Sequence, residues 1–363
     1  MVKLTKTLTS IATIATVAAL ALTGCGRTDS TSGGSSAAAG FDKNAAIGVA
    51  LPQKTSANWV LAEGLFNDGL KSAGFKPNVQ FANGGVTEQQ NQISAMISGG
   101  AKVIIVGAID GSQLGTQLKQ AKDSGATIIA YDRNLTNTAN VDYYVAYDNF
   151  KVGELQGQAL LDGMKAKKAT GPYNIEVFAG SNDDANSKPF FDGAMKVLQP
   201  EIDKGNVKIV SGQKDQNAAA TAGWKAENAQ KRMDTLLAGF YTNTALDGVL
   251  SPNDTLARAI ITSVKAAGKP IPVVTGQDSE AESVKSIMAG EQYSTINKDT
   301  RNLVKAAIQM VSDLQAGKKP ATTTTSNNGT KDVPTQFLTP VVVTKANAAE
   351  QYANDPTLAP LTK

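Results

Sequence analysis

The chain has 363 residues, and its 35 Lys and Arg against 32 Asp and Glu give a formal net charge of +3. These charges are spread along the sequence rather than clustered, so nothing in them indicates binding to nucleic acid. There is no histidine and only one cysteine, which excludes Ser-His-Asp and Cys-His catalysis, zinc sites built from histidine or cysteine clusters, and disulfides within the chain. We expect neither a metal nor a cofactor.

The N-terminal segment has the layout of a secretory signal. Lys3 and Lys6 precede an apolar run from Leu8 to Leu22, and small residues follow. This run is shorter than the roughly 18 residues that a membrane-spanning helix needs. The segment Leu22-Thr23-Gly24-Cys25 resembles the lipobox of bacterial lipoproteins, which implies a signal peptide over residues 1–24 and a diacylglycerol on the Cys25 thiol. The alternative is a plain signal peptide with an incidental cysteine.

A stretch rich in Ser, Gly, Thr and Ala follows Cys25. It offers almost nothing apolar to bury, so residues 25–42 predict a flexible tether. We therefore expect an extracytoplasmic protein that its lipid anchors to the membrane, on the outer face of the cytoplasmic membrane or in the periplasm, without spanning it.

The next part of the chain alternates short apolar or β-branched runs with stretches of helical periodicity. Such alternation predicts βαβ units and a parallel sheet with helices on both faces. Because the strands are almost wholly apolar, both of their faces should be buried. The predicted strands are Ala46–Leu51, Val79–Ala82, Val103–Val106, Thr127–Tyr131 and Tyr143–Tyr147, and the helices are Trp59–Ala73, Thr87–Ser98 and Gln113–Ser124.

A second series of the same kind follows, and the helix Phe150–Met164 leads into it. The sequence thus predicts an α/β fold with two doubly wound parallel sheets, one in each of two domains. The second set of strands is Ile175–Ala179, Val207–Val210, Val249–Ser251, Val273–Thr275 and Tyr293–Ile296; the helices are Lys188–Gln199, Lys225–Ala238, Thr255–Ala267, Ala281–Ala289 and Thr300–Gln315.

Polar residues stand where five of these strands end. In doubly wound sheets ligands bind beyond the carboxyl ends of the strands. Any one of these residues is equally well explained as a helix cap or turn, but together they suit a polyol, whose hydroxyls both donate and accept hydrogen bonds. Trp59 and Trp224 are candidate platforms for the apolar face of a sugar ring. The five strand ends are Asp132-Arg133, Asp148-Asn149, Asn253-Asp254, Gln277-Asp278 and Asn297-Lys298.

Several segments resemble bacterial periplasmic sugar-binding proteins, in particular the xylose- and multiple-monosaccharide-binding receptors of ABC transporters. The segments include Pro52-Gln53-Lys54, Ala57-Asn58-Trp59, Ala130-Tyr131-Asp132-Arg133, Tyr147-Asp148-Asn149 and Gly276-Gln277-Asp278. The resemblance implies a type I periplasmic binding protein, with two lobes joined by a three-segment hinge. The implied ligand-binding residues are Lys54, Asn58, Trp59, Asp132, Arg133, Asp148, Asn149, Asn186, Trp224, Asn253, Asp278 and Lys298.

The lobe boundaries that go with this resemblance are discontinuous in sequence. We expect an N-terminal lobe of residues 43–148 plus 299–320 and a C-terminal lobe of residues 149–298 plus 321–345. Residues 346–363 form a polar tail that we expect to fray. The resemblance also implies a monomer that delivers a pentose or hexose to an ABC permease served by a separate ATPase subunit.

One departure from the resemblance concerns the sugar. Aldose-binding relatives usually carry Arg directly before the tryptophan of the first loop, and this chain has Asn58 there. The neutral amide of Asn58 stands where those relatives have the charged guanidinium of Arg, so a ketose such as fructose becomes plausible.

Two other classes of function stay open at this point. A glycosidase would need two carboxyl groups about 5 to 9.5 Å apart, and Asp132 and Asp278 are the candidates. A receptor for another small polyol-like signal is the second. The Asp183-Asp184 pair in a predicted loop is not assigned to the site.

Overall fold

The structure is a computed structural model, and it describes residues 40–363. The predicted signal peptide, Cys25 and the tether up to residue 39 lie outside the described residues. None of the helices in residues 40–363 is long and apolar enough to cross a membrane.

The first lobe is built on a seven-stranded sheet in the order β11-β12-β5-β4-β3-β1-β2. All neighbouring strands pair in parallel except β11, which runs antiparallel to β12. The strands are β1 (Ala46–Leu51), β2 (Lys76–Phe81), β3 (Val103–Val106), β4 (Thr127–Tyr131), β5 (Tyr143–Tyr147), β11 (Thr324–Asn327) and β12 (Asp332–Leu338).

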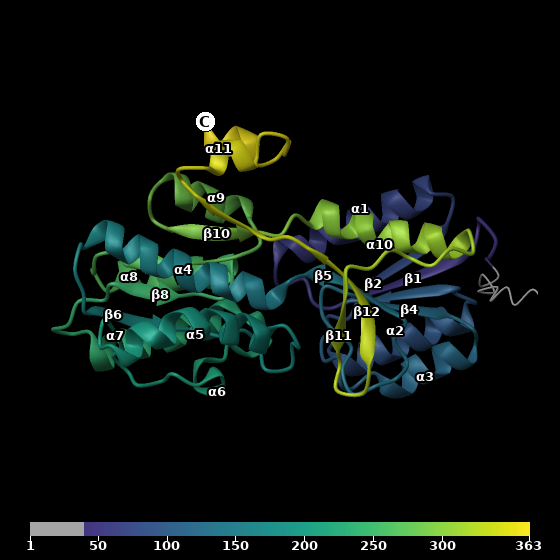
Figure 1. Cartoon of the computed structure of the whole chain (residues 1–363), viewed down its shortest axis with the longest axis horizontal. Coiled ribbons are helices and arrows are strands. Elements are labelled where there is room, and N and C mark those ends of the chain that lie inside the picture. The colour runs from purple at the N-terminus through teal and green to yellow at the C-terminus, as the bar shows by residue number, and fades with distance from the viewer. Residues whose placement is uncertain (1–39) are drawn as a thin grey trace, which may run out of the picture. The chain divides into compact units, whose positions relative to one another are not determined.

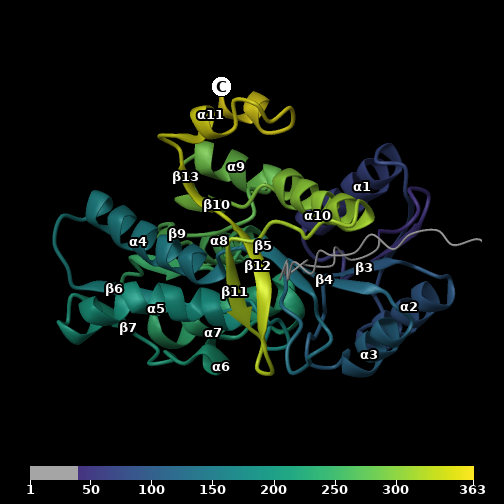
Figure 2. The same ribbon diagram turned by 45° about the vertical axis from the view of Figure 1, so that its right-hand side comes forward.

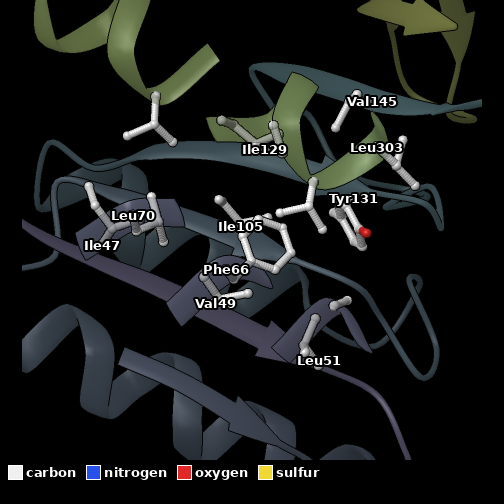
Figure 3. Close-up of a cluster of buried hydrophobic side chains, with 14 of the residues drawn as sticks. Ile47, Val49, Leu51, Phe66, Leu70, Ile105, Ile129, Tyr131, Val145 and Leu303 are labelled. Carbon is white, nitrogen blue, oxygen red and sulfur yellow. The ribbon is translucent and has the colours of Figure 1, made fainter. Parts of the chain in front are cut away.

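Helices cover both faces of this sheet, as the apolar strands require. On one face α1 (Ala57–Ser72) and α10 (Thr300–Gln315) lie side by side, and on the other lie α2 (Val86–Ser98) and α3 (Gly115–Asp123) (Figure 1). Figure 3 shows the core under α1 and α10, where Phe66 lies among strand residues such as Val49 and Ile105. Each such fully buried side chain contributes about 1.5–3 kcal/mol relative to leaving it exposed.

The second lobe contains a four-stranded parallel sheet in the order β7-β6-β8-β9 and a separate antiparallel pair, β10 with β13. These strands are β6 (Tyr173–Val177), β7 (Val207–Ile209), β8 (Gly248–Leu250), β9 (Val273–Val274), β10 (Ser294–Asn297) and β13 (Val341–Thr344). The helices are α4 (Asn149–Lys167), α5 (Ser187–Asp203), α6 (Gln216–Ala219), η1 (Ala222–Trp224), α7 (Ala226–Phe240), α8 (Asp254–Ala266) and α9 (Ala281–Met288).

Two glycines let α4 and α5 approach each other closely. A Cβ atom on Gly153 of α4 would collide with the Phe190 carbonyl of α5, and one on Gly193 of α5 would collide with the Phe150 carbonyl of α4. This crossing places the start of α5, and Phe190 with it, at the edge of the sheet where the polar strand ends gather. The predicted fold class is thereby confirmed: both lobes are α/β layers on parallel sheets.

The predicted assignment of residues 321–345 to the C-terminal lobe is wrong for most of this segment. β12 pairs in parallel with β5, and Val333 is fully buried in the first lobe, so residues 324–338 extend the first sheet. Only β13 joins the second lobe, through its pairing with β10. The chain therefore passes between the lobes at Asp148, at Lys298-Asp299 and at Thr339-Pro340.

The predicted fraying of the tail is also wrong. Its short helices, α11 (Ala348–Gln351) and η2 (Ala359–Thr362), pack on α9 of the second lobe (Figure 2). Tyr352 is 2% exposed, and its hydroxyl donates a hydrogen bond to Ser279 Oγ at 2.6 Å. The carboxylate of Asp355 accepts from both terminal nitrogens of Arg301, at 2.7 and 3.0 Å. The tail owes its order to these aromatic and charged anchors, which its overall polarity conceals.

Candidate ligand-binding site

A polar cleft lies where the strand ends of the two lobes come together, and its side chains leave about 30 Å³ of free space between them. We call it the ligand cleft. It is lined by Ser56, Asn58, Trp59, Asp132 and Arg133 from the first lobe, by Asp184, Asn186, Phe190, Trp224, Asn253, Gln277 and Asp278 from the second, and by Lys298 at a crossing.

Asp132 forms one corner of the ligand cleft. It follows β4 in the left-handed backbone region, with φ 59°, where Asp and Asn are better tolerated than most residues. The Tyr144 hydroxyl donates to the Asp132 carbonyl at 2.7 Å and holds this turn in place. Asn186 of the second lobe donates from Nδ2 to both the carbonyl and Oδ1 of Asp132, each at 3.1 Å. This corner therefore carries a direct polar contact between the lobes.

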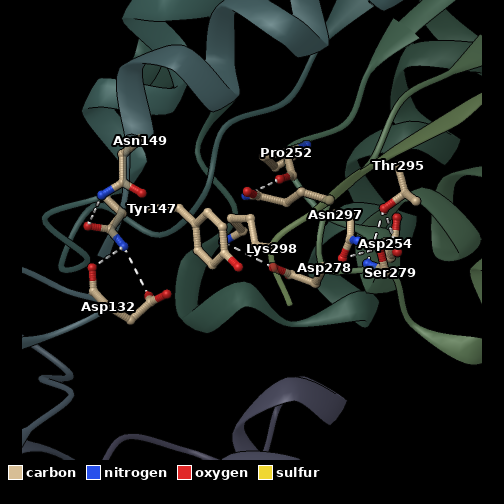
Figure 4. A network of polar contacts seen from close by, with 12 residues as sticks. Asp132, Tyr147, Asn149, Pro252, Asp254, Asp278, Ser279, Thr295, Asn297 and Lys298 are labelled. Atoms are coloured by element: carbon tan, nitrogen blue, oxygen red, sulfur yellow. Dashed lines mark hydrogen bonds and ion pairs between the residues drawn. The ribbon is translucent and has the colours of Figure 1, made fainter. Parts of the chain in front are cut away.

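Asn149 lies behind that corner rather than in the cleft. Its Nδ2 donates to Asn186 Oδ1 at 2.8 Å and to the Tyr144 hydroxyl at 3.2 Å, as Figure 4 shows in part. The amide of Asn186 is thus oriented so that its nitrogen faces Asp132.

A buried ion pair crosses the ligand cleft between Arg133 and Asp184. Arg133 Nε lies 3.0 Å from Asp184 Oδ2, at an angle unsuited to a hydrogen bond. The same Oδ2 accepts from Trp224 Nε1 at 3.0 Å. Arg133 also donates to the Ala108 carbonyl at 3.0 Å, and its guanidinium lies 5.3 Å from the Trp59 ring. Burial raises the pKa of the Asp184 carboxyl, and the Arg133 charge opposes that shift.

A second buried ion pair joins Lys298 and Asp278. Lys298 Nζ lies 3.1 Å from Asp278 Oδ1 (Figure 4). It also lies 5.2 Å from the centre of the Phe190 ring. Burial alone would lower the pKa of Lys298, but the carboxylates of Asp278, Asp132 and Asp184 outweigh it and leave this pKa raised. Lys298 is therefore a permanently charged donor in the cleft.

Two amide oxygens in the cleft wall have no hydrogen-bond partner. Gln277 is 1% exposed and donates from Nε2 to the Pro252 carbonyl at 2.6 Å, yet its Oε1 is buried and unpartnered. Asn58 Oδ1 is likewise buried without a partner. Buried polar atoms are almost always hydrogen-bonded, so these two acceptors fit a ligand that brings hydrogen-bond donors.

Nine of the twelve residues expected to bind ligand line the cleft, and three do not. Lys54 is exposed, pairs with Glu63 at 3.4 Å and lies over Phe81. Asp148 caps α4 by accepting from the Lys151 backbone nitrogen at 3.0 Å. Asn149 contacts Asn186 from behind the cleft, as described above. The expected residues that do line the cleft are Asn58, Trp59, Asp132, Arg133, Asn186, Trp224, Asn253, Asp278 and Lys298.

Four further residues line the cleft that were not among the twelve expected to bind ligand: Ser56, Asp184, Phe190 and Gln277. Gln277 stands within the Gly276-Gln277-Asp278 motif, and Asp184 within an acidic pair, so each carried a weak signal. Among residues 40–363, no three His, Cys, Asp or Glu side chains are placed to hold a metal ion.

Comparison with known proteins gives consistent matches over most of the chain. The pattern of a family described as periplasmic binding protein domain matches residues 47–319. The multiple sugar-binding periplasmic receptor ChvE of Rhizobium radiobacter is 46% identical over 308 residues, which cover 83% of this chain and 87% of the relative. The D-xylose-binding periplasmic protein of Escherichia coli K12 is 36% identical over 314 residues, covering 86% and 91%.

A solved structure agrees with these matches. An ABC transporter solute-binding protein from Clostridium phytofermentans, crystallised with bound β-D-glucose, superposes with a TM-score of 0.83 at 36% identity. The match covers 88% of this chain and 100% of that one.

Proposed function

The chain belongs to the periplasmic binding protein family, and we propose that it captures one monosaccharide in the ligand cleft and delivers it to an ABC sugar permease. Its relatives are sugar-binding periplasmic receptors and a transporter solute-binding protein, so the expectation of a sugar receptor rather than an enzyme is confirmed. The glycosidase alternative is set aside on the same ground.

The observation that carries the proposal is the donor and acceptor set of the cleft. Unpartnered oxygens on Asn58 and Gln277 would accept from sugar hydroxyls, and the charged groups of Arg133 and Lys298 would donate to sugar oxygens. Carboxylates at Asp132 and Asp278 would accept further hydroxyl protons. Because these groups come from both lobes, a sugar that contacts all of them favours the closed state over the open one.

The sugar is proposed from the relatives and from one residue. Relatives described with D-xylose or β-D-glucose make a pentose or an aldohexose the first candidates. Asn58 offers a neutral amide in the first loop, so fructose is included among the candidates.

Titration calorimetry over pentoses, aldohexoses and ketohexoses tests the ligand class. We expect at least one monosaccharide to bind with a dissociation constant in the micromolar range or tighter, about −8 kcal/mol. Tryptophan fluorescence should change in the same titration, since both indoles of the described chain line the cleft. No heat and no fluorescence change with any of these sugars would rule the proposal out.

We further propose that the protein works outside the cytoplasm, as a monomer attached to the membrane through a lipid on Cys25. The periplasmic receptors among its relatives support the location, and the Leu22-Thr23-Gly24-Cys25 sequence supports the lipid. Cys25→Ser should move the protein from the membrane fraction to the soluble fraction. Membrane association that survives this substitution would show that the lipobox interpretation is wrong.

A further inference from the structure

Helix α1 begins at the rim of the ligand cleft without a cap from its own lobe. The first backbone N–H groups of a helix have no partner within it and are usually satisfied by a side chain at the N-cap or in the first turn. Here the N-cap residue Ser56 makes no side-chain capping bond, and the first turn has no acidic residue. The start of α1 therefore carries a partial positive charge, and no side chain of the same segment compensates it.

A carboxylate of the other lobe takes this place. Glu280, directly before α9, accepts a hydrogen bond at Oε1 from the backbone nitrogen of Ala57, the first residue of α1, at 3.3 Å. Glu280 is 6% exposed while Ala57 is exposed, so the contact is shielded from solvent on the Glu280 side only. Neither residue lines the ligand cleft. They share the wall of a neighbouring cavity of about 230 Å³.

The second lobe holds Glu280 in position by contacts of its own. Arg258 pairs with Glu280 Oε2 at 2.6 Å, and the Thr255 hydroxyl lies 2.9 Å from each carboxylate oxygen. The backbone nitrogen of Glu280 donates to Asp254 Oδ2 at 3.0 Å. The carboxylate is therefore aimed before the lobes meet, and closing adds the Ala57 contact with little further ordering.

We propose that Glu280 is a closure residue: its contact with the start of α1 stabilises the closed state without touching the sugar. The inference rests on the proposed function, because it concerns the closure that captures the ligand. Since apparent affinity scales with the population of the binding-competent state, losing this contact should weaken sugar binding by about two- to thirty-fold, the range expected for a charge at a helix N-terminus.

Ala57→Pro removes the donor without breaking α1. Proline is favoured at the first position of a helix, where its missing N–H is not needed by the helix itself. The preceding residue, Ser56, has φ −128° and ψ 146°, the extended conformation that a following proline requires. Glu280→Gln removes the charge from the other side, and Glu282→Gln, an exposed carboxylate paired with Lys285, is the matched control.

The test is a double-mutant cycle on sugar affinity, read by calorimetry in the full chain. Ala57→Pro and Glu280→Gln should each weaken binding, and the double variant should be no weaker than the weaker single variant, because both remove one contact. Fully multiplicative effects, or affinities equal to that of the Glu282→Gln control, would overturn the proposal.

Small-angle scattering without sugar separates this inference from the proposed function. If Glu280 favours closure, Ala57→Pro and Glu280→Gln should each have a larger radius of gyration than the parent and the control. An unchanged radius in both variants would overturn the closure role, even where sugar binds as proposed. If the parent binds no monosaccharide, the proposed function fails while the scattering still decides on the Ala57–Glu280 contact. Should Ala57→Pro not fold, Glu280→Gln against Glu282→Gln decides alone by the same two readouts.

Discussion

Removing the carboxylate of Asp184 should weaken sugar binding far more than it lowers the melting temperature. Asp184 neutralises Arg133 across the cleft and accepts a hydrogen bond from Trp224. Both charged residues are nearly buried, at 5% and 6% exposure. Removing one partner of a buried pair costs about 3–5 kcal/mol, because the other charge is left uncompensated. Burial raises the pKa of Asp184 despite Arg133, so its own desolvation is costly, and the lower figure of about 3 kcal/mol applies.

This penalty belongs to the closed state, because Arg133 and Asp184 come from different lobes and regain water when the lobes separate. For Asp184→Ala we therefore expect affinity to fall by roughly 150-fold, the equivalent of about 3 kcal/mol. The melting temperature without sugar should change by no more than a few degrees. Asp183→Ala, at the exposed neighbouring carboxylate, is the matched control. A variant whose affinity stays within a few fold of the control, or whose loss is mainly in melting temperature, would refute the reasoning.

Four further predictions concern other parts of the described chain. Asn58→Arg has room in the neighbouring cavity of about 230 Å³ and should favour aldopyranoses over ketoses about tenfold or more; identical sugar rankings would show that the first loop does not select. Lys54→Ala should leave affinity within about 0.5 kcal/mol, since Lys54 lies outside the cleft, and a larger loss by calorimetry would contradict that placement. Asp355→Asn should lower the unfolding free energy in urea by about 1 kcal/mol, because the paired Arg301 is partly exposed; an unchanged midpoint would show that this pair does not hold the tail. Burial, and then nearby carboxylates, raise the pKa of Asp254 above its ordinary value of 3.8. The stability that the neutral Asp254 side chain contributes is therefore fully present below pH 3.8 and is lost as pH rises through the folded-state pKa. The melting temperature of the parent should accordingly fall relative to Asp254→Asn as pH rises from about 4 to 8, and a constant difference would argue against a raised pKa.

The buried strands of both sheets could be predicted because their pattern is local. The predicted bounds of β1, β3, β4 and β5 agree with the structure, since an apolar run buried on both faces has clear ends. β11 and β12 could not be predicted in this way. β11 reads Thr-Thr-Ser-Asn and is mostly exposed, and its membership of the first sheet depends on pairing with strands far away in sequence.

The residues of the candidate site likewise fall into those that could be predicted from the local sequence and those that could not. Residues directly after strands, such as Asp132 and Asp278, could be placed in the cleft because strand ends in a parallel sheet share one edge. Asp184 could not, since its role depends on Arg133 in the other lobe, and no spacing along the chain reveals that pair. Lys54 belonged to a motif that adjoins the cleft, and only the geometry shows that its side chain points away toward Glu63.

The order in which the segments of the first lobe occur along the chain has a consequence for its biosynthesis. α10 supplies Leu303 and Met310 to the core beneath α1, and β12 completes the sheet beside β5. Roughly 190 residues separate the ends of β5 and β12, which at about 5–20 residues per second take a ribosome about 10 to 40 s to synthesise. During that interval the emerging chain lacks the parts that would close its first hydrophobic core, so it cannot reach its folded state. For the location proposed above this delay is an advantage, because a chain that is still unfolded can pass through a narrow translocation channel.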